Sequence, residues 1–122
     1  MVPHMTDRIV DPEGRTSERI APRVQSVVMK PTTAASVTSM MEAVVKEGTG
    51  TNAQIPGVQV AGKTGTAETQ IGNTINNVWF IAFAPAANPR VAIAVTLQGV
   101  PGQGAGFAAP VARVVMERLL HD

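Results

Sequence analysis

The sequence predicts an α+β domain in which two amphipathic helices pack on a three-stranded antiparallel sheet. Two segments, about 32–47 and 107–120, place apolar residues at helical spacing. Three strand-like segments lie between them, at about 58–67, 77–84 and 90–98. The connections between these strands are too short for a helical crossover, which favours an antiparallel meander.

The first helix is expected to follow Lys30-Pro31 and to end at Gly48. Thr32 or Thr33 is a candidate N-cap, because a hydroxyl can accept a free backbone N–H of the first turn. Apolar residues recur at i, i+3, i+4, i+7 and i+8 and form one stripe: Val37, Met40, Met41, Val44 and Val45. A stripe with this spacing is typical of a helix face buried in a core.

The second and third strands have different patterns. The run from Val78 to Ala84 lacks a polar face, so we expect it to be covered on both sides and Trp79 to be a core residue. Asn76 and Asn77 fit the turn before it, in the connection 70–77. The segment Val91 to Leu97 alternates large and small residues, and its small face suits a closely packed helix.

A glycine-rich segment, 104–109 (GAGFAA), opens the C-terminal helix and matches the dinucleotide-binding pattern G-x-G-x-x-A. That chemistry requires a further parallel strand, with an acidic residue about 20 positions on, and the sequence has neither. Close approach of the helix to the sheet is therefore the better explanation of these glycines. Towards the N-terminus, residues 1–23 are irregular, and a hairpin between 5–10 and 23–29 is expected.

Composition excludes several classes of function. Ten Lys and Arg residues balance nine Asp and Glu, so no overall field favours nucleic acid. The chain has no cysteine, and its two histidines lie near opposite ends, so no metal site is expected. No signal peptide or membrane-spanning run is recognisable. Only 16% of the residues are charged and 44% are hydrophobic, which suggests that some apolar surface meets a partner of some kind. The alternative is an ordinary alanine-rich globular protein.

The most informative motif is Lys63-Thr64-Gly65-Thr66, within the small-residue strand 58–68 (VQVAGKTGTAE). One lysine and two hydroxyls on a strand suit a site that holds a carboxylate and polarises a carbonyl. The alternative is an exposed lysine among ordinary strand threonines. Glu68 either faces the edge of this site or is simply solvated. No serine or threonine of the chain begins a Ser-x-x-Lys pattern, and no serine begins Ser-x-Asn.

The order of the elements resembles the C-terminal part of a class B penicillin-binding protein transpeptidase domain. The resemblance rests on MMEAVV (40–45), GTGT (48–51), VAGKTGTAE (60–68), NVWFIAFAP (77–85) and the glycine-rich turn into APV (109–111). Its finer features are most similar to the penicillin-binding protein A group of actinobacteria. Ser-x-x-Lys, Ser-x-Asn and Lys-Thr-Gly are the three signatures of such penicillin-binding serine enzymes.

The resemblance implies a role for each residue of the motif. Lys63 would assist proton movement beside the nucleophile and attract the carboxylate of the substrate or β-lactam. Thr64 and Thr66 would offer hydroxyls to that carboxylate, and the Thr66 N–H would form half of an oxyanion hole. Gly65 would keep the strand clear for the acyl group.

The resemblance also implies the setting. Residues 1–122 would be the C-terminal portion of a single transpeptidase domain with the penicillin-binding and serine β-lactamase-like fold. The partner would be the rest of that domain, which carries Ser-x-x-Lys and Ser-x-Asn, and this chain alone should be inactive. Ligands would be the peptidoglycan stem peptide and β-lactams, with no cofactor, at the extracytoplasmic face of the bacterial plasma membrane, with the anchor outside this chain. The alternatives are a serine β-lactamase, a non-catalytic β-lactam sensor or a stand-alone interaction module.

Overall fold

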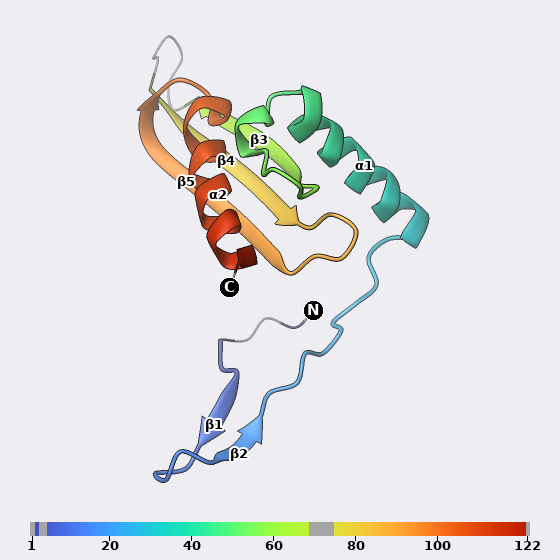
Figure 1. Cartoon of the computed structure of the whole chain (residues 1–122), viewed down its shortest axis with the longest axis vertical. Coiled ribbons are helices and arrows are strands. Elements are labelled where there is room, and N and C mark those ends of the chain that lie inside the picture. The colour runs from blue at the N-terminus through green and yellow to red at the C-terminus, as the bar shows by residue number, and fades with distance from the viewer. Residues whose placement is uncertain (1, 3–4, 69–74, 122) are drawn as a thin grey trace. The chain divides into compact units, whose positions relative to one another are not determined.

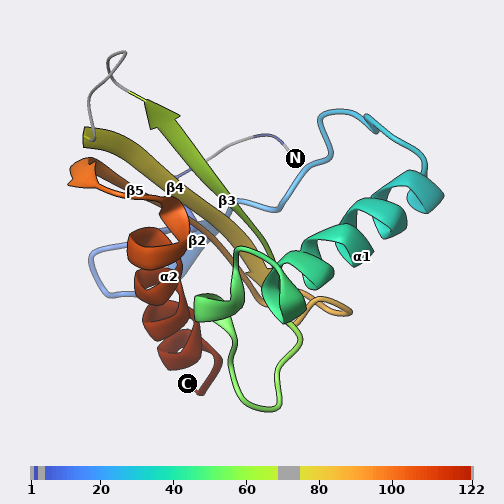
Figure 2. The same cartoon turned by 90° about the horizontal axis from the view of Figure 1, so that it is seen from above.

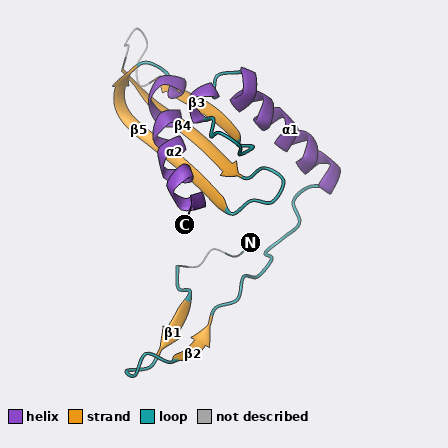
Figure 3. Ribbon diagram, viewed as in Figure 1, coloured by secondary structure: helices purple, strands orange, loops and turns teal. Residues whose placement is uncertain are grey.

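The computed structural model describes residues 2, 5–68 and 75–121, which fall into two compact units, Met1–Pro31 and Thr32–Asp122 (Figures 1 and 3). The first unit contains β1 (Arg8–Val10) and β2 (Thr16–Arg19). The second contains the other elements: α1 (Pro31–Glu47), the 3₁₀ turn η1 (Thr51–Ala53), β3 (Ala61–Glu68), β4 (Ile75–Ala84), β5 (Val91–Pro101) and α2 (Gly104–His121). No helix in the described ranges is long and apolar enough to cross a bilayer.

The first unit is an antiparallel hairpin, in which Arg8 pairs with Arg19. The hairpin was expected, but its predicted second strand, 23–29, is wrong because that segment has no strand structure. Asp11 is the reason: its Oδ1 accepts from the N–H groups of Glu13 (3.1 Å) and Arg15 (2.8 Å). These bonds form a tight turn directly after β1, so the residues that follow Arg15, not 23–29, pair with β1.

The sheet of the second unit has the order β3-β4-β5, and both pairings are antiparallel. The predicted meander is confirmed. In its register, Lys63 lies opposite Ile81, and Ile81 lies opposite Ala94. Of the predicted connection 70–77, residues 70–74 lie outside the described part, and β4 already begins at Ile75.

One face of this sheet carries the core, and we call it the closed face. Helix α2 lies along it over β4 and β5 (Figures 1 and 2). The flat side of α2 consists of Ala108, Ala109 and Ala112, and it packs in one cluster with the fully buried Val78 and Phe80. Small helix residues bring the helix axis close to the strands, and burying a side chain such as Phe80 contributes about 1.5–3 kcal/mol.

The opposite face, which we call the open face, corrects three predictions. Burial alternates along β4, so Trp79 and Ile81 are 45% and 48% exposed, and Trp79 is not a core residue. Strand β4 is therefore covered on one side only by the described residues. The large residues of β5 pack towards the core and α2, while the small residues Ala92 and Ala94 lie on the exposed side. Helix α2 contacts the face of β5 that carries the large residues, because these residues complete the core on the closed face.

Helix α1 also differs from its prediction. It begins at Pro31, a residue favoured at the first helical position, so Thr32 and Thr33 lie inside the first turn. Its apolar stripe is only partly covered: Val45 is buried, Met41 and Val44 are half-buried, and Val37 is 38% and Met40 61% exposed. Only the C-terminal end of α1 lies against the body of the unit, and its first turns project beyond the sheet (Figure 2).

Helix α2 begins at Gly104, three residues before its predicted start. A Cβ on Gly104 would lie 2.6 Å from the Trp79 carbonyl oxygen and 2.8 Å from that of Gly65. Since both neighbours are backbone atoms of the sheet, neither can move aside. The predicted role of the glycine-rich segment, close approach of helix to sheet, is confirmed at this residue.

We expect Gly104→Ala to lower the free energy of unfolding by about 2–3 kcal/mol, because the added methyl overpacks against two fixed carbonyls. The matched control is Gly106→Ala in the same helical turn, where an added Cβ meets nothing within 4 Å. This control should raise the free energy of unfolding by about 0.5–1 kcal/mol. Urea unfolding measures both, and equal stabilities of the two variants would contradict the close packing.

The hairpin turn predicts a pH dependence. Hydrogen bonds from the backbone and side chain of Arg15 hold the pKa of Asp11 below its usual value. A lowered folded-state pKa means that the carboxylate stabilises the turn above the ordinary pKa of about 3.9, and that this stabilisation is lost as pH falls through the lowered value. NMR titration of the hairpin amides should show this transition. It should disappear in Asp11→Asn, which keeps the acceptor oxygen but cannot titrate.

Candidate active site

The Lys63-Thr64-Gly65-Thr66 motif lies in the middle of β3, at one edge of the sheet. Within the described residues, β3 pairs along its length only with β4, so its other edge has no strand partner. An unpaired strand edge presents backbone N–H and C=O groups that can bind an extended ligand.

The side chains of the motif alternate between the two faces. Lys63 and Gly65 lie opposite Ile81 and Trp79 and share the open face. Thr64 and Thr66 share the other face, since they lie opposite Phe80 and Val78. Lys63 and Thr66 are exposed and Thr64 is half-buried, so charge and hydroxyls flank the same edge from its two sides.

The Lys63 ammonium bends back to its own strand, where Nζ donates to the Thr64 carbonyl at 2.7 Å. This carbonyl therefore points away from β4. Carbonyl and amide groups of alternate residues point to the same side of a strand, so the Thr66 N–H points to this edge as well. One lysine and one backbone donor are thus available on the same side of β3.

Both threonine hydroxyls have partners within the chain. Thr64 Oγ1 lies 2.7 Å from Thr49 Oγ1, in the loop after α1. Thr66 Oγ1 accepts from the Gly104 N–H at 3.4 Å, at the start of α2. Thr49, in the loop after α1, and Gly104, the first residue of α2, thus fix the positions of the two hydroxyls by hydrogen bonds.

Gly65 is packed on both faces of the sheet. A Cβ there would lie 3.3 Å from Trp79 Cβ, and Gly104 approaches the Gly65 backbone from the closed face. Gly65 therefore leaves only backbone between Trp79 and Gly104, and its expected role beside an acyl group stays a prediction. Glu68, at the end of β3, is exposed.

The sequence pattern predicts no role for Thr49 or Asn52, and for Gly104 it predicts only close packing. Asn52 Nδ2 donates to the Ala105 carbonyl at 2.8 Å and ties η1 to the first turn of α2. The loop 48–51 (GTGT) was part of the family resemblance, but nothing in its sequence shows that it reaches β3. That contact depends on where α1 ends relative to the sheet.

Asn76 and Asn77 do not lie in a turn, as predicted, but inside β4. Asn76 Nδ2 donates to the Gly102 carbonyl (2.8 Å), and Asn77 Oδ1 accepts from the Gly99 N–H (3.2 Å). Their side chains hold the end of β5, where the register of the β4–β5 pair shifts.

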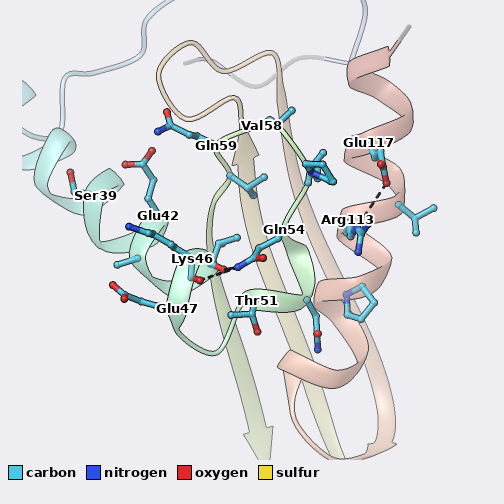
Figure 4. A pocket seen from close by; sticks show the side chains of 18 residues that line it. Ser39, Glu42, Lys46, Glu47, Thr51, Gln54, Val58, Gln59, Arg113 and Glu117 are labelled. Atoms are coloured by element: carbon cyan, nitrogen blue, oxygen red, sulfur yellow. Dashed lines mark hydrogen bonds and ion pairs between the residues drawn. The ribbon is translucent and has the colours of Figure 1, made fainter.

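A separate hollow of about 1130 Å³ lies between the end of α1, residues 51–60 and α2 (Figure 4). Charges of both signs line it, including Glu42, Lys46, Arg113 and Glu117, and Gln54 Nε2 donates to the Val45 and Lys46 carbonyls at 3.0 and 2.9 Å. No residue of the Lys63–Thr66 motif lines this hollow.

Comparison with known proteins identifies the family. The model of the penicillin binding protein transpeptidase domain matches residues 1–117. The peptidoglycan D,D-transpeptidase PbpA of Mycolicibacterium smegmatis is 34% identical over 128 aligned positions, covering all of this chain and 26% of the relative. Stage V sporulation protein D of Bacillus subtilis is 34% identical over 98% of this chain and 20% of the relative.

Solved structures show the same fold. The crystal structure of PBPA from Mycobacterium tuberculosis matches with a TM-score of 0.80 and 34% identity, over 93% of this chain and 26% of that one. The imipenem acyl-enzyme complex of penicillin-binding protein A from the same organism matches with a TM-score of 0.77 and 36% identity, over 93% of this chain and 25% of that one. The chain spans about a quarter of the length of these relatives. The expected α+β fold and the expected resemblance to penicillin-binding protein A are confirmed, and the chain belongs to the penicillin-binding protein transpeptidase family.

Proposed function

We propose that this chain supplies one wall of the active site of a penicillin-binding D,D-transpeptidase, which crosslinks peptidoglycan by serine acyl transfer. The observation that carries the proposal is the edge of β3. There Lys63, two oriented hydroxyls and an outward backbone N–H lie together in a chain of the transpeptidase family. Residues 1–122 would form the C-terminal portion of one domain.

In this proposal the nucleophilic serine comes from a Ser-x-x-Lys segment outside these residues. Its oxygen attacks the substrate carbonyl, and the oxygen of that carbonyl becomes negative in the tetrahedral intermediate. The Thr66 N–H stabilises this charge, because a strand edge holds a donor in place without reorganisation. Lys63 assists proton movement at the serine and, with Thr64 and Thr66, binds the terminal carboxylate. Gly65 leaves room for the acyl group beside the strand.

Exposed apolar residues on the open face and on α1 are evidence for a partner segment. Trp79 and Ile81 are about half exposed on it, and the stripe of α1 exposes Val37 and Met40. Exposed apolar area of this kind marks an interaction surface. We propose that the rest of the transpeptidase domain, with Ser-x-x-Lys and Ser-x-Asn, covers the open face next to Lys63. The whole protein would act at the extracytoplasmic face of the plasma membrane, on the stem peptide and β-lactams.

The first test is acylation of the complete domain, in which this chain is joined to the nucleophile segment, by a fluorescent penicillin. We expect Lys63→Gln to slow acylation by about 10²–10⁴-fold, the usual contribution of a group that assists proton transfer. The matched control is Lys46→Gln, another exposed lysine, which lies on α1 away from the motif. Lys46→Gln should acylate at the wild-type rate.

Intact-mass spectrometry locates the adduct. Modification of a serine outside residues 1–122 supports the proposal. Modification of a serine within this chain would overturn it, because none has the lysine that should activate it. An adduct that forms and is quickly hydrolysed would instead indicate a β-lactamase.

Trp79 is the only tryptophan of the chain and reports on the open face. When a tryptophan-free nucleophile segment is added, we expect its emission to shift to shorter wavelength and acrylamide quenching to fall, since burial removes water from the indole. Trp79→Phe, with the segment added, gives the background signal. Unchanged quenching on binding would show that the partner covers another surface.

A further inference from the structure

Thr49 is the one side chain outside the Lys63–Thr66 motif whose hydroxyl, among the bonds described here, meets a hydroxyl of that motif. Its Oγ1 lies 2.7 Å from Thr64 Oγ1, across 15 positions of sequence. This is the usual length of an O–H···O hydrogen bond. Thr49 is exposed and Thr64 is half-buried, so the pair lies at the surface beside the strand edge.

The loop that carries Thr49 is held firmly. The N–H groups of Gly48 and Gly50 both donate to the Val44 carbonyl, at 3.1 and 2.9 Å. A Cβ on Gly50 would lie 3.2 Å from Val44 Cγ1 and 3.4 Å from the Phe80 ring. The loop is therefore tied to the end of α1 on both sides of Thr49 and packs on the core at Gly50, which fixes the place of the Thr49 hydroxyl relative to β3.

The donor and acceptor capacity of a hydroxyl limits which of Thr49 and Thr64 can donate in this hydrogen bond when a carboxylate is bound. Each threonine hydroxyl has one proton to donate and can also accept. An ionised carboxylate only accepts, so Thr64 must use its single proton to bind one. Thr64 can do so while keeping its bond to Thr49 only if Thr49 donates to Thr64. A carboxylate at the strand edge thus selects one direction, Thr49 to Thr64 to carboxylate, in which each bond polarises the next.

We propose that Thr49 is a positioning residue that orients the Thr64 hydroxyl as a donor to the carboxylate of the substrate or β-lactam. This inference rests on the proposed function. The second threonine of the motif has a comparable arrangement, since the Gly104 N–H donates to Thr66 Oγ1 at 3.4 Å. Each hydroxyl therefore has beside it a group of this chain that can donate to it, which would leave its own proton for a ligand.

The test compares acylation of the complete domain by benzylpenicillin and by its methyl ester, which lacks the charged carboxylate. Thr49→Val keeps the shape of the side chain and removes its hydroxyl. We expect it to lower the second-order acylation constant for benzylpenicillin about 5- to 10-fold, mainly through weaker initial binding. For the ester the change should be less than about twofold, because no carboxylate depends on Thr64. Thr49→Ser keeps the hydroxyl and should restore the wild-type preference.

A double-mutant cycle completes the test. In a Thr64→Val background, Thr49→Val should cause no further change in the preference for the free acid, because Thr49 acts through Thr64. Equal losses with both compounds would mean that Thr49 only supports the loop, and no loss with either would mean that it has no role; both results overturn the inference. If the wild-type domain is not acylated at all, the proposed function itself fails. Thermal unfolding of each variant shows whether the fold is kept.

Discussion

The close approach of α2 to the sheet at Gly104 is the constraint on which the rest of the second unit depends. The first helical residue lies against the carbonyls of Gly65 and Trp79, where no side chain fits. From this contact α2 runs along the closed face, and its alanines pack against Val78 and Phe80. The same contact brings a helix N-terminal amide to the hydroxyl of Thr66. Packing and the proposed chemistry therefore share one backbone contact.

The edge strand β3 is held from two directions. The loop after α1 contacts Thr64 through Thr49, and the start of α2 contacts Thr66 through Gly104. Asn52 links these two supports by its bond to Ala105. A strand at the edge of a sheet is otherwise free to bend, so such supports fix the donors that a reacting carbonyl and carboxylate need in advance.

The two faces of the sheet differ in how far their apolar residues are buried. The closed face is packed to full burial at Phe80, whereas Trp79, its neighbour in sequence, is 45% exposed. Lys63 lies on the same open face as Trp79 and Ile81. The apolar surface beside the lysine is where the proposed further segment of the domain would lie.

The sequence by itself determined the α+β class, the three antiparallel strands, both helices and the Lys63–Thr66 motif, because periodicity and short connections are local properties. It did not determine which side of each strand is buried. Both faces of β4 carry apolar residues in the run 78–84, so the sequence does not distinguish them. Only the position of α2 decided that Phe80 is core and Trp79 is exposed. The exposed stripe of α1 and the contact of Thr49 with Thr64 likewise depend on where α1 ends relative to the sheet. Only the tertiary structure could decide these features, because they join residues that are far apart in the chain.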